Sequence, residues 1–165
     1  GGGRGLWTDL APMTLPRQEV GAARIGDRVY VCGGLILGSP SRATNTVEVY
    51  TVSENDWDPG PLMPLALDHL AVSALDGYVY VMGGFTRNFQ GGGITMAESF
   101  RLADGAAEWE PIAPMPESRA GHWSVAHGGK IYIFGGVQTG VGVRASVLIY
   151  DPVLDEWTAG AADMP

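Results

Sequence analysis

The sequence predicts an all-β fold built from three repeats, each about 50 residues long and able to hold four short strands. A six-residue phrase recurs as VYVCGG (29–34), VYVMGG (79–84) and IYIFGG (131–136). No segment shows a sustained helical period, and glycine and proline recur too often for helices of ordinary length. Turn signals separate short β-rich runs within each repeat, which is the pattern of antiparallel strands.

Several residue types mark the same period, so the repeat does not rest on one motif. The double glycines lie 50 and 52 residues apart, a tyrosine lies three residues before each, and tryptophans and methionines keep nearly the same spacing. The structural repeat positions are Gly33, Gly34, Gly83, Gly84, Gly135, Gly136, Tyr30, Tyr80, Tyr132, Trp57, Trp109 and Trp157. Trp7 precedes this series, and Met13, Met63 and Met115 each follow a tryptophan by six residues.

The first two strands of each repeat are predicted to form a hairpin. The turns between them are Ile25-Gly26-Asp27, Leu75-Asp76-Gly77 and His127-Gly128-Gly129, whose residues favour tight hairpin connections. The second strand is apolar on both sides: in KIYIFGG, two isoleucines face one way and Tyr132 and Phe134 face the other. A strand that is apolar on both sides is buried on both sides, so the sheets are expected to stack face to face.

A third and a fourth strand are predicted after a longer loop. The third strands are VEVY (47–50), AESF (97–100) and VLIY (147–150), and the fourth strands carry the tryptophans in NDWDP, AEWEP and DEWTA. This alignment places Phe100 at the position of Tyr50 and Tyr150 and two extra residues in RLADGAAEW. It also aligns Glu48 with Glu98 as charges at strand edges.

The paired glycines are predicted to be structural. A glycine lets the chain leave the strand where backbone or a side chain of the next sheet comes close. A phosphate-binding loop is disfavoured, because no Lys-Ser/Thr and no helix follow the glycines.

Composition excludes several classes of site. Lys and Arg number 10 against 18 Asp and Glu, giving a net charge of −8, which disfavours nucleic-acid binding. One cysteine, Cys32, excludes an intrachain disulfide and a multi-cysteine metal site, and it is expected in the core. No apolar run approaches about 18 residues, so no membrane span is expected. No targeting signal is visible, and the compartment is left open.

With these motifs the chain resembles the kelch repeat family. The resemblance covers roughly residues 7–165 and implies a β-propeller whose blades are four-stranded antiparallel sheets. The expected parts are an N-terminal tail (1–6), an extra outer strand or linker (7–16), and three blades (17–61, 62–113 and 114–165). The family includes ubiquitin-ligase substrate receptors, actin-binding proteins, sialic acid mutarotases and galactose-oxidase-like enzymes, so fold alone does not assign a function.

Three blades cannot close a propeller, which needs about four to eight. In a homodimer, each chain would supply half of a six-bladed ring. Such a closed ring agrees with the closed symmetry of most oligomers. The alternative is that the chain is part of a longer propeller. The strand count leaves one outer strand surplus, at Trp7 or at Trp157, and the sequence does not choose between them.

Five arginines are expected near one face of the propeller. The loops 35–46, 85–96 and 137–146 each contain one, and two more precede the first strands of units one and three, where unit two has Leu67. The resemblance implies that such arginines line a pocket for acidic ligands, since a guanidinium binds carboxylates through paired hydrogen bonds. The expected ligand-binding residues are Arg17, Arg42, His69, Arg87, Asn88, Arg119 and Arg144. The alternative is that these arginines are simply solvated.

No catalytic residue, metal site or cofactor is predicted. Three scattered histidines do not have metal-ligand spacing, and no nucleophile motif is present. The function expected from the sequence is a non-enzymatic binding scaffold for a protein, a peptide or an acidic small ligand. A carbohydrate-active propeller similar to a sialic acid mutarotase is the alternative.

Overall fold

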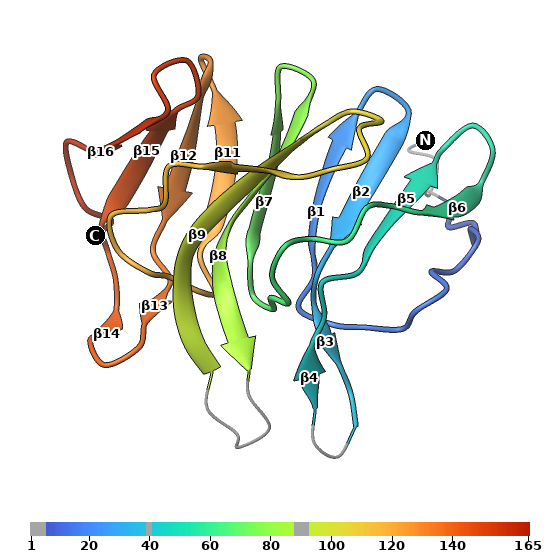
Figure 1. Ribbon diagram of the computed structural model, residues 1–165, viewed down its shortest axis with the longest axis horizontal. Helices are drawn as coiled ribbons and strands as arrows, with labels where there is room; N and C mark the ends of the chain where they lie inside the picture. Colours follow the sequence, from blue (N-terminus) through green and yellow to red (C-terminus); the bar gives the residue numbers. More distant parts are fainter. Residues whose placement is uncertain (1–5, 39–40, 88–92) are drawn as a thin grey trace, which may run out of the picture.

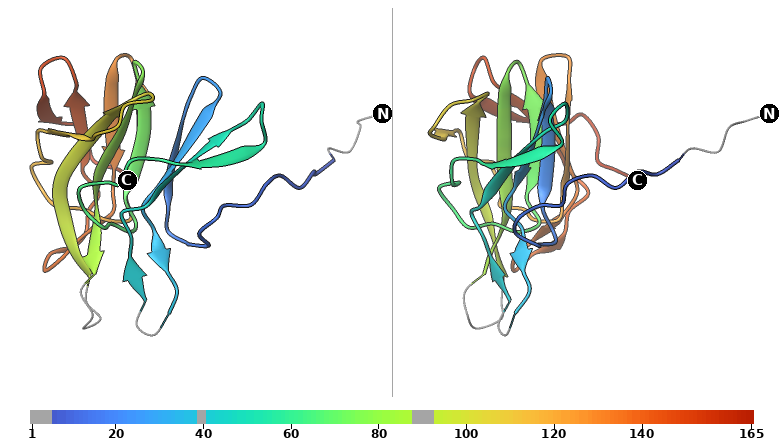
Figure 2. Two further views of the ribbon diagram at one scale, coloured as in Figure 1. Left: turned by 45° about the vertical axis from the view of Figure 1, so that its right-hand side comes forward. Right: turned by 90° about the vertical axis from the view of Figure 1, so that its right-hand side faces the viewer.

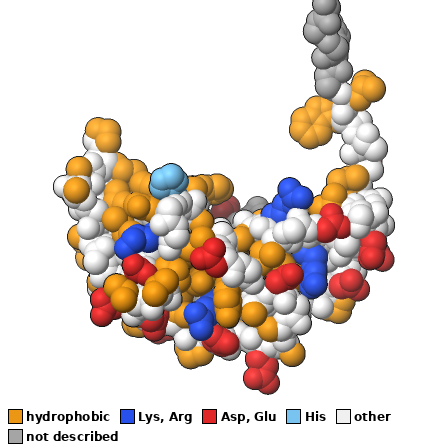
Figure 3. Space-filling view, turned by 90° about the horizontal axis from the view of Figure 1, so that it is seen from above, with side chains coloured by type: hydrophobic (Ala, Val, Ile, Leu, Met, Phe, Trp, Pro, Cys, Tyr) orange, Lys and Arg blue, Asp and Glu red, His pale blue; other side chains and the backbone are white. Residues whose placement is uncertain are grey.

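Three four-stranded antiparallel sheets stand side by side in the computed structural model, which describes residues 6–38, 41–87 and 93–165 (Figure 1). The described residues contain no helix, and so none that is long and apolar enough to cross a membrane. Seen from above, the sheets form an arc that is hollowed on one side (Figure 3). The all-β prediction of three stacked blades is confirmed.

Each blade begins with an inner strand and ends with an outer one. Blade 1 has the order β1 (Gly21–Ile25), β2 (Arg28–Cys32), β5 (Val47–Thr51), β6 (Asp56–Pro59). Blade 2 consists of β7 (Ala71–Leu75), β8 (Tyr78–Arg87), β9 (Gly93–Ala103) and β10 (Glu110–Ile112). Blade 3 consists of β11 (Trp123–His127), β12 (Lys130–Phe134), β15 (Val147–Asp151) and β16 (Glu156–Ala159).

The outer strand of blade 3 comes from the end of the described chain, because β16 pairs with β15. Residues 6–16 form no strand, and their first part leads away from the blades (Figure 2). Their last part returns to blade 1, where Ala11 accepts a hydrogen bond from the indole of Trp57 at 2.7 Å. In this structure Trp157, and not Trp7, therefore occupies the outer strand of blade 3.

Three hairpins extend the blades on one side, called here the loop face. They are β3–β4 (Leu35–Ile36 and Arg42–Ala43), the ends of β8 and β9, and β13–β14 (Val137–Gln138 and Gly142–Val143), at the lower edge of Figure 1. The last two hairpins are joined by reciprocal hydrogen bonds, in which the amides of Thr95 and Thr139 each donate to the other's hydroxyl at 3.0 Å.

The register of blade 2 corrects one sequence alignment. Leu102 pairs with Val79 as Tyr50 pairs with Val29, so Leu102, and not Phe100, occupies the tyrosine position. The two extra residues of this repeat therefore belong to the hairpin that β8 and β9 form, and not to RLADGAAEW. Two residues added to a hairpin that projects from the blade leave the pairing of the central strands unchanged, so an insertion is tolerated there.

Apolar clusters fill the spaces between neighbouring blades. Between blades 1 and 2, Tyr30, Cys32 and Val47 pack with Val79 and Val81. A second cluster between blades 2 and 3 includes Tyr80, Met82, Ile131, Ile133 and Tyr150. Cys32 is fully buried as predicted, and burial raises the pKa of its thiol to about 12.

Each double glycine is in close contact with the segment of chain that follows its blade. The N–H of Gly34 donates to the carbonyl of Leu67 at 2.8 Å, and that of Gly84 donates to the carbonyl of Arg119 at 2.8 Å. The first glycine of each pair has a positive φ and lies under a methionine, so it can carry no side chain. The pairs of glycine and methionine are Gly33 with Met63, Gly83 with Met115 and Gly135 with Met164. Met164 lies outside the six-residue spacing that identified the other methionines.

A second chain of hydrogen bonds links the blades on the hollow side of the arc. Glu19, His69 and Gly121 precede the three inner strands with φ values of 56°, 53° and 62°. The N–H of His69 donates to the carbonyl of Glu19 at 3.1 Å, and the N–H of Gly121 donates to that of His69 at 2.9 Å. The blades are thus joined by backbone as well as by apolar packing.

Replacing Gly83 with alanine tests the close approach. A Cβ at this position would lie 2.5 Å from Met115 Cε and 2.6 Å from the carbonyl oxygen of Arg119, at a φ of 56°. Gly83→Ala is expected to lower the free energy of unfolding by about 2–4 kcal/mol, from conformational strain and overpacking together. Gly128→Ala is the matched control, with a similar φ of 59° and no atom within 4 Å of its Cβ. It should cost about 1 kcal/mol, and equal losses in urea denaturation would contradict the steric account.

Candidate functional site

Two of the arginines expected in the ligand pocket are buried and bound within their own blades. The side chains of Arg17 and Arg119 are both 0% exposed. Each guanidinium is held by a glutamate and by backbone carbonyls. The expectation that they bind ligand is therefore corrected: a guanidinium that is fully buried and paired with a glutamate is not accessible to a ligand and acts as a structural group.

In blade 1 the partner of Arg17 is Glu48 on β5. The guanidinium also donates to the carbonyl of Val31 at 3.0 Å, and the amide of Thr14 donates to Glu48 at 2.8 Å. Burial alone would raise the pKa of Glu48, but the hydrogen bonds from Thr14 and Arg17 outweigh it and hold the pKa below its usual value. This ion pair fixes residues 14–17 against the blade.

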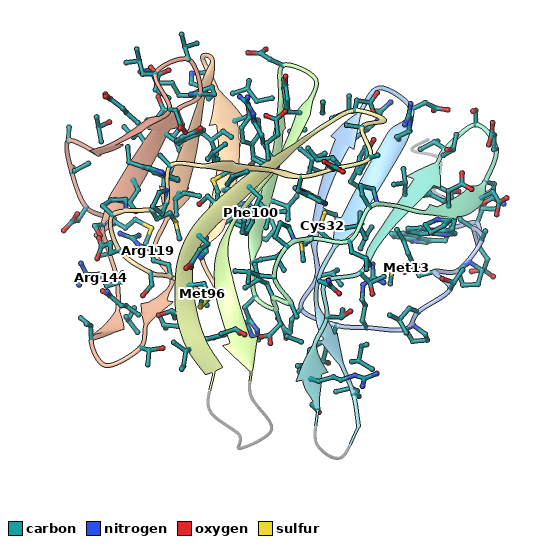
Figure 4. All side chains as sticks on the ribbon, viewed as in Figure 1. Met13, Cys32, Met96, Phe100, Arg119 and Arg144 are labelled. Atoms are coloured by element: carbon teal, nitrogen blue, oxygen red, sulfur yellow. The ribbon has the colours of Figure 1, made fainter. Side chains whose placement is uncertain are left out.

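In blade 3 the partner of Arg119 is Glu117. The guanidinium donates to Glu117 at 2.7 Å and to the carbonyls of Gly135 at 3.0 Å and Ser146 at 2.7 Å. Arg144 pairs with the other oxygen of Glu117, so the two arginines lie next to each other (Figure 4). Burial alone would raise the pKa of Glu117. The two arginines and Ser146 outweigh burial, so the pKa lies below its usual value.

Blade 2 replaces this polar arrangement with apolar residues. Its equivalents of Arg17 and Glu48 are Leu67 and Phe100, and both are buried. The same position in a blade can thus be filled by an ion pair or by an apolar pair. Glu48 is not equivalent to Glu98, which is exposed and lies at the irregularity between the two paired stretches of β9, 93–96 and 99–103.

In its described part, the loop face combines exposed apolar side chains with one exposed arginine. Arg42 lies on β4 and is exposed. Arg87 ends β8 but its side chain is not described, and Asn88 lies outside the described residues. The exposed apolar residues come from all three hairpins: Leu37, Ile94, Val141 and Val143. The described part of this face is suited to apolar contacts and can add a charged hydrogen bond from Arg42.

A groove of about 330 Å³ runs along the hollow side of the arc, over the starts of β1, β7 and β11. His69 in its wall lies 2.6 Å from Asp68 and 3.3 Å from Glu19. His122 is almost completely buried, which lowers its pKa to about 4, so the neutral ring donates from Nε2 to the carbonyl of Met82 at 3.0 Å. Trp123 also lines the groove.

The groove is lined mainly by apolar residues and glycines, with Glu19 as its carboxylate. Its described lining includes carboxylate and imidazole groups but no arginine or lysine, so it does not fit an acidic ligand. His69 and Arg119, which the sequence predicts together in one ligand site, are therefore not brought together in this groove. No group of three His, Cys, Asp or Glu among the described residues could hold a metal ion.

Sequence reasoning missed the two glutamates that neutralise the buried arginines. Glu117 lies two residues before Arg119, and this short spacing is a signal that could have suggested the pair. No comparable signal marks Glu48, because it lies 31 residues after Arg17 and the fold alone brings them together.

Comparisons with known proteins agree with the architecture. The Kelch motif matches residues 16–64 and 118–162. Beta-scruin of Limulus polyphemus is 32% identical over 93% of this chain, and Kelch-like protein 15 of Danio rerio is 30% identical over 96%. Kelch-like protein terF of Aspergillus terreus is 33% identical over 70%. The solved structure of YjhT matches 94% of the chain with a TM-score of 0.79 at 20% identity.

The chain is much shorter than these proteins. It spans 18% of beta-scruin, 28% of Kelch-like protein 15 and 27% of Kelch-like protein terF. It spans 54% of the YjhT chain, so about three blades match roughly half of that structure.

The apolar pair of blade 2 supplies a test of the ion pair in blade 1. Arg17→Leu alone would leave Glu48 buried without its partner and should lower the free energy of unfolding by about 3–5 kcal/mol. The double variant Arg17→Leu, Glu48→Phe copies blade 2 and should recover most of this loss. Urea denaturation of the wild type, both single variants and the double variant measures the coupling. Additive losses in the double variant would show that the two side chains do not act as a pair.

Proposed function

Because this chain belongs to the kelch-repeat family, we propose that it is a non-enzymatic interaction scaffold whose loop face binds a protein partner. The observation that carries the proposal is the row of exposed apolar side chains on hairpins from all three blades. Exposed apolar patches on a rigid scaffold are typical of interaction sites. The hydrogen bonds between Thr95 and Thr139 support this, since they hold two of the hairpins in a fixed relation.

The loop face offers fewer positive charges to a partner than the pocket of five arginines expected from the sequence. Arg17, Arg119 and Arg144 are all paired with glutamates, which leaves Arg42 as the arginine on the described loop face with an exposed side chain. A peptide segment that presents apolar side chains beside a carboxylate fits this surface best. A small ligand that depends on several carboxylates would find fewer donors than the sequence suggests.

Two exposed valines distinguish the loop face from the opposite side. Val143 on β14 is 86% exposed, and Val153, in the turn between β15 and β16, is 88% exposed at the other end of the blade (Figure 1). Val143→Asp is expected to weaken binding to selected members of a displayed peptide library about 10-fold or more. Val153→Asp should leave the same titrations unchanged. Equal effects of both substitutions would place the binding surface elsewhere.

We further propose that two copies of the chain complete a six-bladed ring. In blades 1 and 2, the next blade covers a set of apolar positions on the second strand. The same positions in blade 3 are not covered, and this supports the proposal. Tyr30 and Cys32 are buried under blade 2, whereas their equivalents Tyr132 and Phe134 are only partly buried. Two three-bladed arcs related by a two-fold axis would cover both open ends.

Light scattering at several protein concentrations tests the ring. A homodimer predicts a mass near twice 17.4 kDa at micromolar concentration, because both apolar ends are covered only in the closed form. A mass of one chain at every concentration would contradict the homodimer. The blades that complete a ring would then not come from a second copy of this chain. The proposal for the loop face is tested separately, by the two valine substitutions.

A further inference from the structure

The contacts between blades within the chain depend on a small residue at the start of the inner strands β1 and β7. A Cβ at Gly21 would overlap Val72 of the next blade. The equivalent residue in blade 2 is Ala71, which is only 3% exposed beneath blade 3. Beside it, the hydroxyls of Ser73 and Ser124 are hydrogen-bonded at 2.7 Å. The interface between blades 1 and 2 and the interface between blades 2 and 3 are called internal seams here.

Blade 3 breaks this pattern. The residue equivalent to Gly21 and Ala71 is Trp123, whose side chain is 77% exposed. Val125 follows it on the same side of β11 and is also exposed, and apolar side chains gather at the blade 3 end of the arc in Figure 3. A blade that packed with a residue as large as Val72 at the facing position would collide with this tryptophan.

The chain itself contains a residue small enough to face the tryptophan across a seam. The residues that face Gly21 and Ala71 from the next blade are Val72 and Ser124, and their equivalent in blade 1 is Ala22. Ala22 is exposed and lines the same groove as Trp123. A large side chain facing a small one keeps the total volume of a seam within what neighbouring blades can accommodate.

We infer that Trp123 is the anchor of the ring-closing seam and packs over Ala22 of a second copy of this chain. The inference rests on the proposed homodimer and assigns the side chains that make it. Each copy supplies Trp123 at one end and Ala22 at the other, so the two-fold axis produces two identical seams. A single tryptophan in a small-residue pocket is the typical centre of an interface.

The backbone at both ends is arranged for the same seam. In the internal seams the second glycine of a pair donates its N–H to the carbonyl of Leu67 or Arg119 in the next blade. The equivalent donor at the end of the arc is Gly136, and the equivalent acceptor is Arg17 of the second copy. Met164 already covers Gly135, so the second copy does not need to supply Met13.

A double-mutant cycle on residues 123 and 22 tests the inference. Trp123→Gly leaves a hole in the seam and should raise the dimer Kd about 30-fold or more. Ala22→Val overfills the seam and should raise the Kd about 10-fold. The double variant recreates the pair Gly21 and Val72 of the first internal seam and should return the Kd to within about 5-fold of the wild type. Sedimentation or light scattering at a series of concentrations gives each Kd.

Controls separate this inference from the proposed homodimer. Trp7→Gly removes a tryptophan that is more exposed than Trp123, from the N-terminal segment, and should leave the Kd unchanged. Far-ultraviolet circular dichroism checks that each variant folds. A glycine at position 123 is compatible with the blade, because the equivalent residue in blade 1 is Gly21. A wild-type dimer whose Kd does not respond to Trp123→Gly, or a double variant with additive losses, overturns the seam while the homodimer stands. A wild type that remains monomeric overturns both.

Discussion

The close approach at the double glycine determines how the blades stack. Gly33 and Gly83 lie under methionines of the following segment, and the glycine after each donates its N–H across to the next blade. No side chain fits there, and the positive φ favours glycine for a second reason. The strands that enter the first two glycine pairs, β2 and β8, are consequently buried on both faces. The three recurring phrases mark this contact in the sequence, and the apolar clusters lie beside it between the blades.

The same stacking decides which arginines can bind a partner. Residues that lead into an inner strand fold back against their own blade, so Arg17 and Arg119 are buried and need carboxylate partners. Residues on the projecting hairpins remain in solvent, as Arg42 and Val143 do. Binding is therefore expected on the hairpins, and the leading segments serve as structural braces. Stacking also accounts for the open ends, because each blade of the arc needs a neighbour on both sides.

Much of the fold could be predicted from the sequence, because the repeat reports contacts that recur. The glycine pairs and the tyrosine before them identified the buried second strands. The register of blade 2 was misread, since Phe100 resembles the expected aromatic residue more than Leu102 does and only strand pairing separates them. The candidate site was predicted less well. Burial of Arg17 depends on Glu48, a partner that is distant in sequence.

The central claim is that the open ends of the arc close by repeating the internal seam. The amides of His69 and Gly121 each donate to the preceding blade, and Glu19 has the same φ at the open end of blade 1. In a closed ring the amide of Glu19 would donate to the carbonyl of Gly121 of the second copy. Amide hydrogen exchange by NMR measures this directly. We predict that the Glu19 amide is protected to about the same degree as those of His69 and Gly121. Exchange of the Glu19 amide at the rate of an unstructured peptide would contradict closure by this seam.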